Sequence, residues 1–127
     1  MVEIIVAKDA GFCFGVKNAV RLALDHAENG ACYMIGDLIH NRQVVDELGA
    51  RGLKTADDAD GLPVAKPGVK PKAIIRSHGA PKSLYRQLAE KGYDAVDATC
   101  PFVMKIHDIV EKHYNDGYHI VIVGSAE

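Results

Sequence analysis

The 127-residue sequence has no tryptophan, few aromatic residues and only three cysteines. Because three is an odd number, the cysteines do not suit a simple disulfide framework. No apolar run approaches the roughly 20 residues that a membrane-spanning helix needs. The N-terminus has an early acidic residue and no long apolar core, which excludes a secretory signal. These absences predict a cytoplasmic protein whose cysteines are reduced, metal-bound or catalytic.

The sequence also lacks an excess of charge of either sign. Its formal net charge is -2, so neither a nucleic acid nor an anionic membrane surface is an expected partner. The length and the 48% content of hydrophobic residues are typical of one globular domain that buries a real core.

Short apolar segments alternate with amphipathic segments along the chain. Strands are expected at 2–7, 32–36, 53–55, 72–76, 94–97 and 118–123. Helices are expected at 16–28 and 41–48, from Pro81 to Gly92, and from Pro101 to Gly117. The proline-rich stretch 56–72 is predicted to be a surface connection. This alternation predicts an α/β fold, with a parallel sheet flanked by helices on both faces.

Four residues with useful chemistry fall in loops that precede expected helices: Cys13, His40, His78 and Cys100. Loops of this kind gather along one edge of a parallel α/β sheet, so these side chains are expected to share that edge. Helix N-termini attract anions, which favours a phosphorylated ligand. The same field favours a thiolate, and thiolates bind soft metals and iron–sulfur clusters.

Each of these residues also has a structural explanation. A cysteine near a helix start is often a small buried residue. His40 could cap a turn, and His78 could hold its loop through backbone carbonyls. Cys32 lies inside an expected strand and is predicted to belong to the core. A surface or packing role is expected for His26, His107, His113 and His119.

Four motifs occur in a characteristic order: GFCFGVKNAV, IGDLIHNRQVVDELGARG, IIRSHGAP and DATCPFVMKIH. Together they resemble the N-terminal part of 4-hydroxy-3-methylbut-2-enyl diphosphate reductase. This is the iron–sulfur enzyme that closes the methylerythritol phosphate route to isoprenoid precursors. The resemblance runs from Val2 to the end of the chain.

The resemblance implies a [4Fe-4S] cluster held by cysteines, of which the first two fall on Cys13 and Cys100. It implies that His40 and His78 bind the diphosphate of the substrate. The implied reaction is reductive removal of an allylic hydroxyl, which yields isopentenyl and dimethylallyl diphosphate. Ferredoxin or flavodoxin is the implied electron donor.

The sequence departs from the family pattern in two places. The third cluster cysteine of the family has no match here, because Cys32 does not occupy its position. The motif with the proton-donating acid would follow Gly124, so that acid is expected beyond Glu127. The implied enzyme has several α/β lobes; 14–99 would form the first, and 100–127 would begin the second. We therefore expect an N-terminal portion that is inactive alone and exposes apolar surface around 118–123.

Two alternatives stay open at this point. The first is a non-catalytic α/β module that binds a phosphorylated ligand through His40 and His78. The second is a structural zinc site built from these histidines with Cys13 and Cys100, since zinc favours tetrahedral nitrogen and sulfur ligands. The spacing lacks the close ligand pairs of common zinc modules. Metal analysis would separate the three possibilities. Iron with sulfide would indicate the reductase, no metal would indicate the non-catalytic module, and zinc would indicate the structural zinc site.

Overall fold

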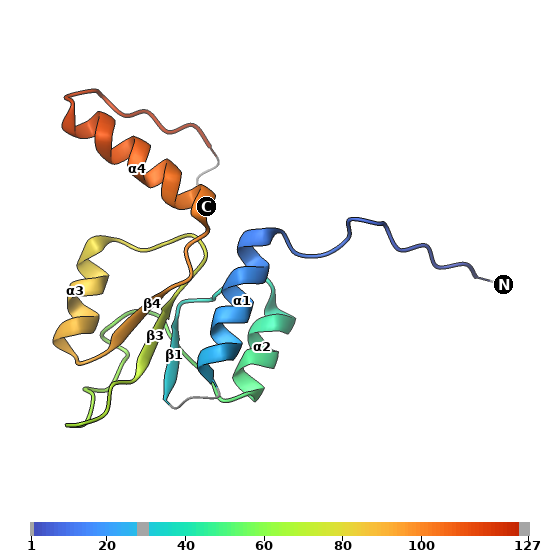
Figure 1. Cartoon of the computed structure of the whole chain (residues 1–127), viewed down its shortest axis with the longest axis horizontal. Coiled ribbons are helices and arrows are strands. Elements are labelled where there is room, and N and C mark those ends of the chain that lie inside the picture. Colours follow the sequence, from blue (N-terminus) through green and yellow to red (C-terminus); the bar gives the residue numbers. More distant parts are fainter. Residues whose placement is uncertain (1, 28–30, 125–127) are drawn as a thin grey trace.

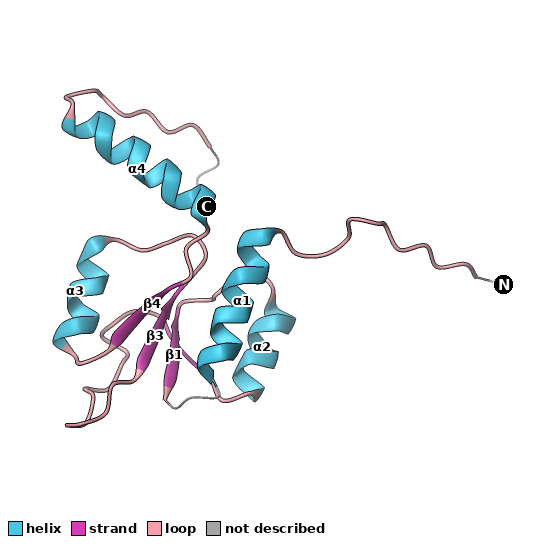
Figure 2. Ribbon diagram, in the orientation of Figure 1, coloured by secondary structure: helices cyan, strands magenta, loops and turns pink. Residues whose placement is uncertain are grey.

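The computed structural model describes residues 2–27 and 31–124. Within them, one parallel sheet has the strand order β2-β1-β3-β4, and Figure 2 shows β1, β3 and β4 side by side. The strands are β1 (Cys32–Ile35), β2 (Lys54–Ala56), β3 (Lys72–Ile75) and β4 (Asp94–Asp97). The helices are α1 (Phe14–Ala27), α2 (Arg42–Ala50), α3 (Lys82–Glu90) and α4 (Pro101–Asn115). The predicted α/β fold with a parallel sheet is therefore confirmed.

The helices cover both faces of the sheet, as the alternation predicted. Helices α1 and α2 lie on one face and α3 on the other (Figure 1). In β1, Cys32 and Met34 belong to the core cluster under α1 and α2. Ile35 belongs to the cluster under α3, and Tyr33 packs against it. Successive side chains of a strand point to opposite faces, so each short strand contributes to two cores.

The predicted helix starts hold for α2 and α4, whereas α1 begins at Phe14, two residues before the predicted start, and α3 begins one residue after Pro81. Asn41 caps α2, because its side-chain oxygen accepts a hydrogen bond from the N–H of Val44 at 3.2 Å. Pro101 occupies the first position of α4, where its missing N–H has no cost. Pro81 is the N-cap residue of α3 and not part of its first turn, so the helix begins at Lys82. Glu28, the expected end of the first helix, lies outside the described residues.

The strands predicted at 2–7 and 118–123 are wrong. Neither segment pairs with the sheet within the described residues. Residues 2–7 are exposed and extend away from the sheet, while 118–123 runs back alongside α4 (Figure 1). Both segments have the β-branched composition of a strand, but strand propensity reflects packing on a pleated neighbour as much as the backbone itself. The composition alone therefore did not determine the pairing.

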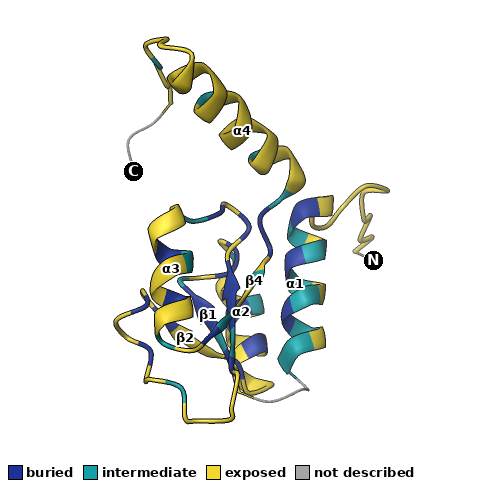
Figure 3. Cartoon of the chain, turned by 60° about the vertical axis from the view of Figure 1, so that its left-hand side comes forward, coloured by how far each residue is buried: buried dark blue, intermediate teal, exposed yellow. Residues whose placement is uncertain are grey.

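Helix α4 forms where it was expected, but its apolar face is not covered. The large apolar residues Phe102 and Ile106 are 72% and 59% exposed, and α4 has no buried residue. The helix projects from the end of β4, away from the sheet (Figure 3). No helix in the described ranges is long and apolar enough to cross a membrane.

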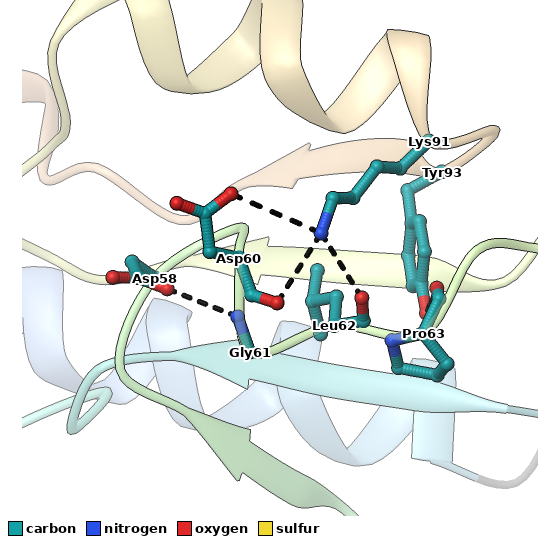
Figure 4. Close-up of polar contacts among 7 residues, drawn as sticks. All are labelled: Asp58, Asp60, Gly61, Leu62, Pro63, Lys91 and Tyr93. Carbon is teal, nitrogen blue, oxygen red and sulfur yellow. Dashed lines mark hydrogen bonds and ion pairs between the residues drawn. The ribbon is translucent and has the colours of Figure 1, made fainter.

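The connection after β2 is more firmly anchored than a surface loop. Its Ala59 and Leu62 are buried in the core under α3. The Lys91 ammonium donates hydrogen bonds to the carbonyls of Asp60 at 3.3 Å and Leu62 at 3.1 Å (Figure 4). The Tyr93 hydroxyl donates to the carbonyl of Pro63 at 2.9 Å. The connection is therefore fastened to the end of α3.

Replacing Lys91 by methionine tests this anchor. Lys91→Met keeps the apolar stem and leaves two carbonyls without their charged donor. We expect the free energy of unfolding to fall by about 1–2 kcal/mol, because hydrogen bonds to charged groups are worth about 1.5–3 kcal/mol and this one is partly hydrated. Urea unfolding measures this change in the free energy of unfolding. Lys66→Met, an exposed lysine of the same connection, is the control, and equal stability of the two variants would contradict the anchor.

Candidate functional site

The two predicted site histidines meet at the carboxyl edge of the sheet. His40 lies in the loop after β1, and His78 lies in the loop after β3. Their ring centroids are 4.8 Å apart with an angle of 31° between the rings. Both side chains are exposed, so neither histidine is part of the hydrophobic core. Strands β1 and β3 pair in parallel from Cys32 with Lys72 to Ile35 with Ile75, which brings their following loops together.

A pocket of about 200 Å³ opens beside these histidines. The loop before α1 forms its third wall, through Phe12. Its lining residues are Phe12, Val16, Ile39, His40, Asn41, Ser77 and His78. Three loops therefore meet at one place although they are far apart in sequence: the GFCFG loop (11–15), the HN loop (40–41) and the SHG loop (77–79).

The surroundings of His78 disfavour its charged form, although its side chain remains largely exposed. Burial lowers the pKa of His78, and the nearby positive charges of His40 and Arg76 lower it further. A neutral imidazole still offers one N–H donor. A bound anion would favour the protonated form instead, because an opposite charge nearby stabilises it.

The loop that carries Cys13 leads into a helix turn that contacts Cys100. Cys13 is exposed immediately before α1, and Cys100 is the half-buried residue that caps α4. A Cβ atom built on Gly15 would lie 2.6 Å from the Sγ of Cys100. The first turn of α1 therefore packs directly on Cys100, and only glycine fits there. This contact brings the loop of Cys13 to Cys100 even though no described strand precedes α1.

Cys32 is a core residue, as predicted from its place in a strand. It is 3% exposed within the cluster under α1 and α2. Burial raises the pKa of the Cys32 thiol, which keeps it protonated. It does not contribute to the edge where Cys13 and Cys100 lie.

The donor set fits part of an iron–sulfur site. Cys13 and Cys100 each precede a helix, and cysteine sulfur is the ligand type that holds iron–sulfur clusters. The described part of the chain holds no group of three metal-ligating side chains suited to one ion. Two cysteines can thus supply two cluster ligands. The same finding counts against a zinc site made from both cysteines and both histidines.

A carboxylate that the sequence analysis overlooked lies behind Cys100. Both oxygens of Asp97 accept hydrogen bonds: one from the backbone N–H of Thr99 at 2.9 Å and from its hydroxyl, the other from the Tyr85 hydroxyl at 2.8 Å. Asp-x-Thr before a helix suits a turn in which aspartate bonds its own backbone, so the DATC motif carried a detectable signal.

This hydrogen-bonding network changes the acidity of its members. Burial opposes the charged form of Asp97, but the hydrogen bonds from Thr99 and Tyr85 and the charge of His107 outweigh it and lower the pKa of that carboxyl. Burial and the neighbouring Asp97 raise the pKa of Tyr85 to about 12. The carboxylate is therefore ionised and the phenol protonated at neutral pH.

Comparison with known proteins shows the family of this chain. The family model described as LytB protein matches residues 4–127. The chain belongs to the LytB family. Among curated relatives, the 4-hydroxy-3-methylbut-2-enyl diphosphate reductase of Clostridioides difficile is 43% identical over 98% of this chain and 44% of its own length. The protein of that name from Alkaliphilus oremlandii is 46% identical over 96% of this chain and 43% of its own length.

Solved structures of the same family have the same fold. A structure of (E)-4-hydroxy-3-methyl-but-2-enyl diphosphate reductase is 40% identical with a TM-score of 0.74, over 98% of this chain and 43% of that chain. The Plasmodium falciparum reductase is 25% identical with a TM-score of 0.78, over 87% of this chain and 34% of that chain. This LytB chain therefore spans less than half the length of the relatives it matches, and it matches their N-terminal portion.

Gly15→Ala tests the close contact between α1 and Cys100. The added methyl group would overlap the Cys100 thiol, so we expect the free energy of unfolding to fall by about 1–3 kcal/mol. Gly49→Ala is the matched control, because Gly49 lies in α2 with nothing within 4 Å of its added Cβ. There alanine should stabilise by about 0.5–1 kcal/mol through helix propensity. Urea unfolding curves that shift in the same direction for both variants would contradict the contact.

Proposed function

We propose that this LytB chain is the N-terminal portion of a 4-hydroxy-3-methylbut-2-enyl diphosphate reductase. In this proposal it contributes two diphosphate-binding imidazoles and two cluster thiolates to that enzyme. The observation that carries the proposal is the meeting of three separate loops: His40 and His78 lie 4.8 Å apart, and the GFCFG loop reaches their pocket. Close relatives that bear the reductase name support it.

His40 and His78 would bind the diphosphate group through N–H donors at the rim of the pocket. A charge-assisted hydrogen bond to an anionic oxygen is stronger than a neutral one. Burial and the charges of His40 and Arg76 lower the pKa of free His78, and a bound diphosphate would raise it. The Arg76 charge that lowers the pKa of free His78 would also attract the anion.

Cys13 and Cys100 would hold two irons of a [4Fe-4S] cluster. When bound, that cluster supplies the electrons for reductive removal of the allylic hydroxyl, which gives isopentenyl and dimethylallyl diphosphate. Cys100 is fixed by Gly15 on one side and by its turn on the other. Cys13 lies in an exposed loop, where it can adjust to the cluster.

The rest of the enzyme belongs to the proposal as well. Residues 14–99 would be its first lobe and 100–127 the beginning of its second. The two core clusters draw their members from this first range, whereas α4 buries none of its residues. A third cysteine and the proton-donating acid would come from further sequence of the enzyme, and this portion would be inactive alone. We also propose ferredoxin or flavodoxin as electron donor and a cytoplasmic location.

A non-catalytic module that binds a phosphorylated ligand is the second candidate. The pocket beside His40 and His78 would suit that role without any metal. In such a module the contact between Gly15 and the Cys100 thiol would serve packing alone. Metal content separates the two functions.

Cysteine substitutions in the complete LytB protein test the cluster assignment. Cys13→Ser or Cys100→Ser should lower iron and acid-labile sulfide well below the wild-type content, because an alkoxide is a harder and less available ligand than a thiolate. Chemical analysis of anaerobically purified protein and electron paramagnetic resonance after reduction measure this. Cys32→Ala is the control, since this core cysteine should affect stability but not iron. Full iron content in Cys100→Ser would contradict the assignment.

Histidine substitutions test the anion site separately. His40→Asn or His78→Asn should weaken binding of inorganic diphosphate roughly ten- to hundredfold, the equivalent of about 1.5–3 kcal/mol for hydrogen bonds to a charged group. Cluster absorption should be unchanged. Titration calorimetry measures the affinity. His113→Asn, a histidine of α4 whose ring packs on Tyr118, is the control, and an affinity equal to this control would assign both histidines a structural role.

A further inference from the structure

We propose that Asp97 is a positioning residue that links the thiolate half of the site to the histidine half. Together with Tyr85 and Thr99 it fixes the turn that carries Cys100, and that turn is fastened to the loop that presents His78. Binding of an anion at His78 and retention of a metal cluster at Cys100 are then coupled. This inference rests on the proposed function and assigns a role to residues outside the four predicted ligands.

Asp97 uses both of its oxygens. One accepts from the backbone N–H of Thr99 at 2.9 Å and from the Thr99 hydroxyl. The other accepts from the Tyr85 hydroxyl of α3 at 2.8 Å. The carboxylate therefore joins the end of β4, the turn behind it and a helix on one face of the sheet. With its side chain and N–H both held, Thr99 has little freedom, and Cys100 follows it directly.

The same turn is fastened to the SHG loop. The backbone N–H of Cys100 donates to the carbonyl of Ser77 at 2.9 Å. On the other side, a Cβ built on Gly79 would lie 3.3 Å from the hydroxyl oxygen and the methyl carbon of Thr99. His78 thus lies between one residue bonded to Cys100 and another packed on Thr99. A shift of the turn must move the loop.

Helix α4 contributes the last contact. The Cε1 atom of His107 would lie 2.8 Å from a Cβ on Gly79, so this ring presses against the SHG loop. Gly79 also has a φ of 81°, which side chains other than glycine rarely adopt. The charge of His107 acts on the Asp97 carboxylate. Helix α4 therefore contacts, through His107, the same loop that Thr99 touches.

The Cys100 thiol is tightly packed against the first turn of α1. Gly15 leaves no room for a methyl group beside the Sγ of Cys100. A small displacement of the turn therefore changes where the thiolate points relative to the loop of Cys13. If the two sites are coupled through these contacts, each changes the affinity of the other by the same factor, and coupled sites typically show 5- to 150-fold effects.

The experiment measures this coupling in the complete, cluster-loaded LytB protein. The rate at which a strong iron chelator removes the cluster absorption is followed with and without inorganic diphosphate, far below the unfolding temperature. In wild-type protein, diphosphate should slow the loss several-fold. In Asp97→Asn, the loss should be about tenfold faster, as expected when a charge-assisted hydrogen bond is weakened, and the protection by diphosphate should disappear.

Further variants separate positioning from stability. Tyr85→Phe and Thr99→Val each remove one hydroxyl donor and should reproduce part of the effect, and they carry the test if Asp97→Asn fails to fold. Thr99→Ser keeps the hydroxyl that bonds Asp97 and loses only the methyl carbon that faces Gly79, so its rates should lie closer to wild type than those of Thr99→Val. Asp94→Asn is the matched control: this carboxylate lies at the opposite end of β4 and pairs with Lys72 at 2.8 Å. It should leave both the chelation rate and the diphosphate protection unchanged.

The outcomes separate this inference from the function it rests on. If wild-type protein holds no iron or binds no diphosphate, the proposed function fails and the coupling fails with it. If wild-type protein does both, but all three network variants lose iron at the rate of Asp94→Asn, the function stands and the positioning role is overturned. Variants that only unfold at lower temperature, with unchanged chelation rates, overturn it as well.

Discussion

Parallel pairing of β3 with β1 and β4 is the constraint on which the candidate site depends. The registers align Ile35 with Ile75 and Ile75 with Asp97. The three strands therefore end at the same level, and the loops behind them open at one edge of the sheet. Parallel strands are joined by helical crossovers, so each of these loops also leads into a helix. His40, His78 and Cys100 lie in these three loops.

Two close contacts at glycine convert this shared edge into a compact site. Gly15 lets the first turn of α1 approach the Cys100 thiol, and Gly79 lets His107 approach the SHG loop. Neither contact follows from strand pairing. They add the loop of Cys13 and the start of α4 to a site that the sheet alone would leave incomplete. The Asp97 network then holds the turn between these contacts in one conformation.

The exposed apolar surface has the same origin as the unpaired segments. Helix α4 has the amphipathic pattern of a packed helix, yet no element among the described residues covers its apolar face. Residues 2–7 and 118–123 have strand composition without a neighbouring strand. An amphipathic pattern records which face of an element prefers burial, whereas burial itself needs a partner surface. These segments are consistent with the proposal that the chain is one portion of a larger α/β enzyme.

The sequence by itself determined the elements with strong local signals. The spacing of apolar residues predicted the helices, Asn41 and Pro101 marked two of their starts, and short β-branched runs predicted the central strands. Alternation of these elements led to a parallel sheet, and that topology led to one edge for His40, His78 and Cys100. Four ordered motifs led to the LytB family. All of this is local chemistry, or topology that follows from the order of elements.

Only the tertiary structure decided the contacts between segments that are distant in sequence. It refuted the strands at 2–7 and 118–123, because a strand needs a neighbour as well as propensity. It buried Ala59 and Leu62 in a connection predicted to lie on the surface. It placed Cys100 against Gly15, and it revealed the bonds from Tyr85 and Thr99 to Asp97. Such contacts depend on which side chains share a few ångströms of space, and neither periodicity nor composition encodes that distance.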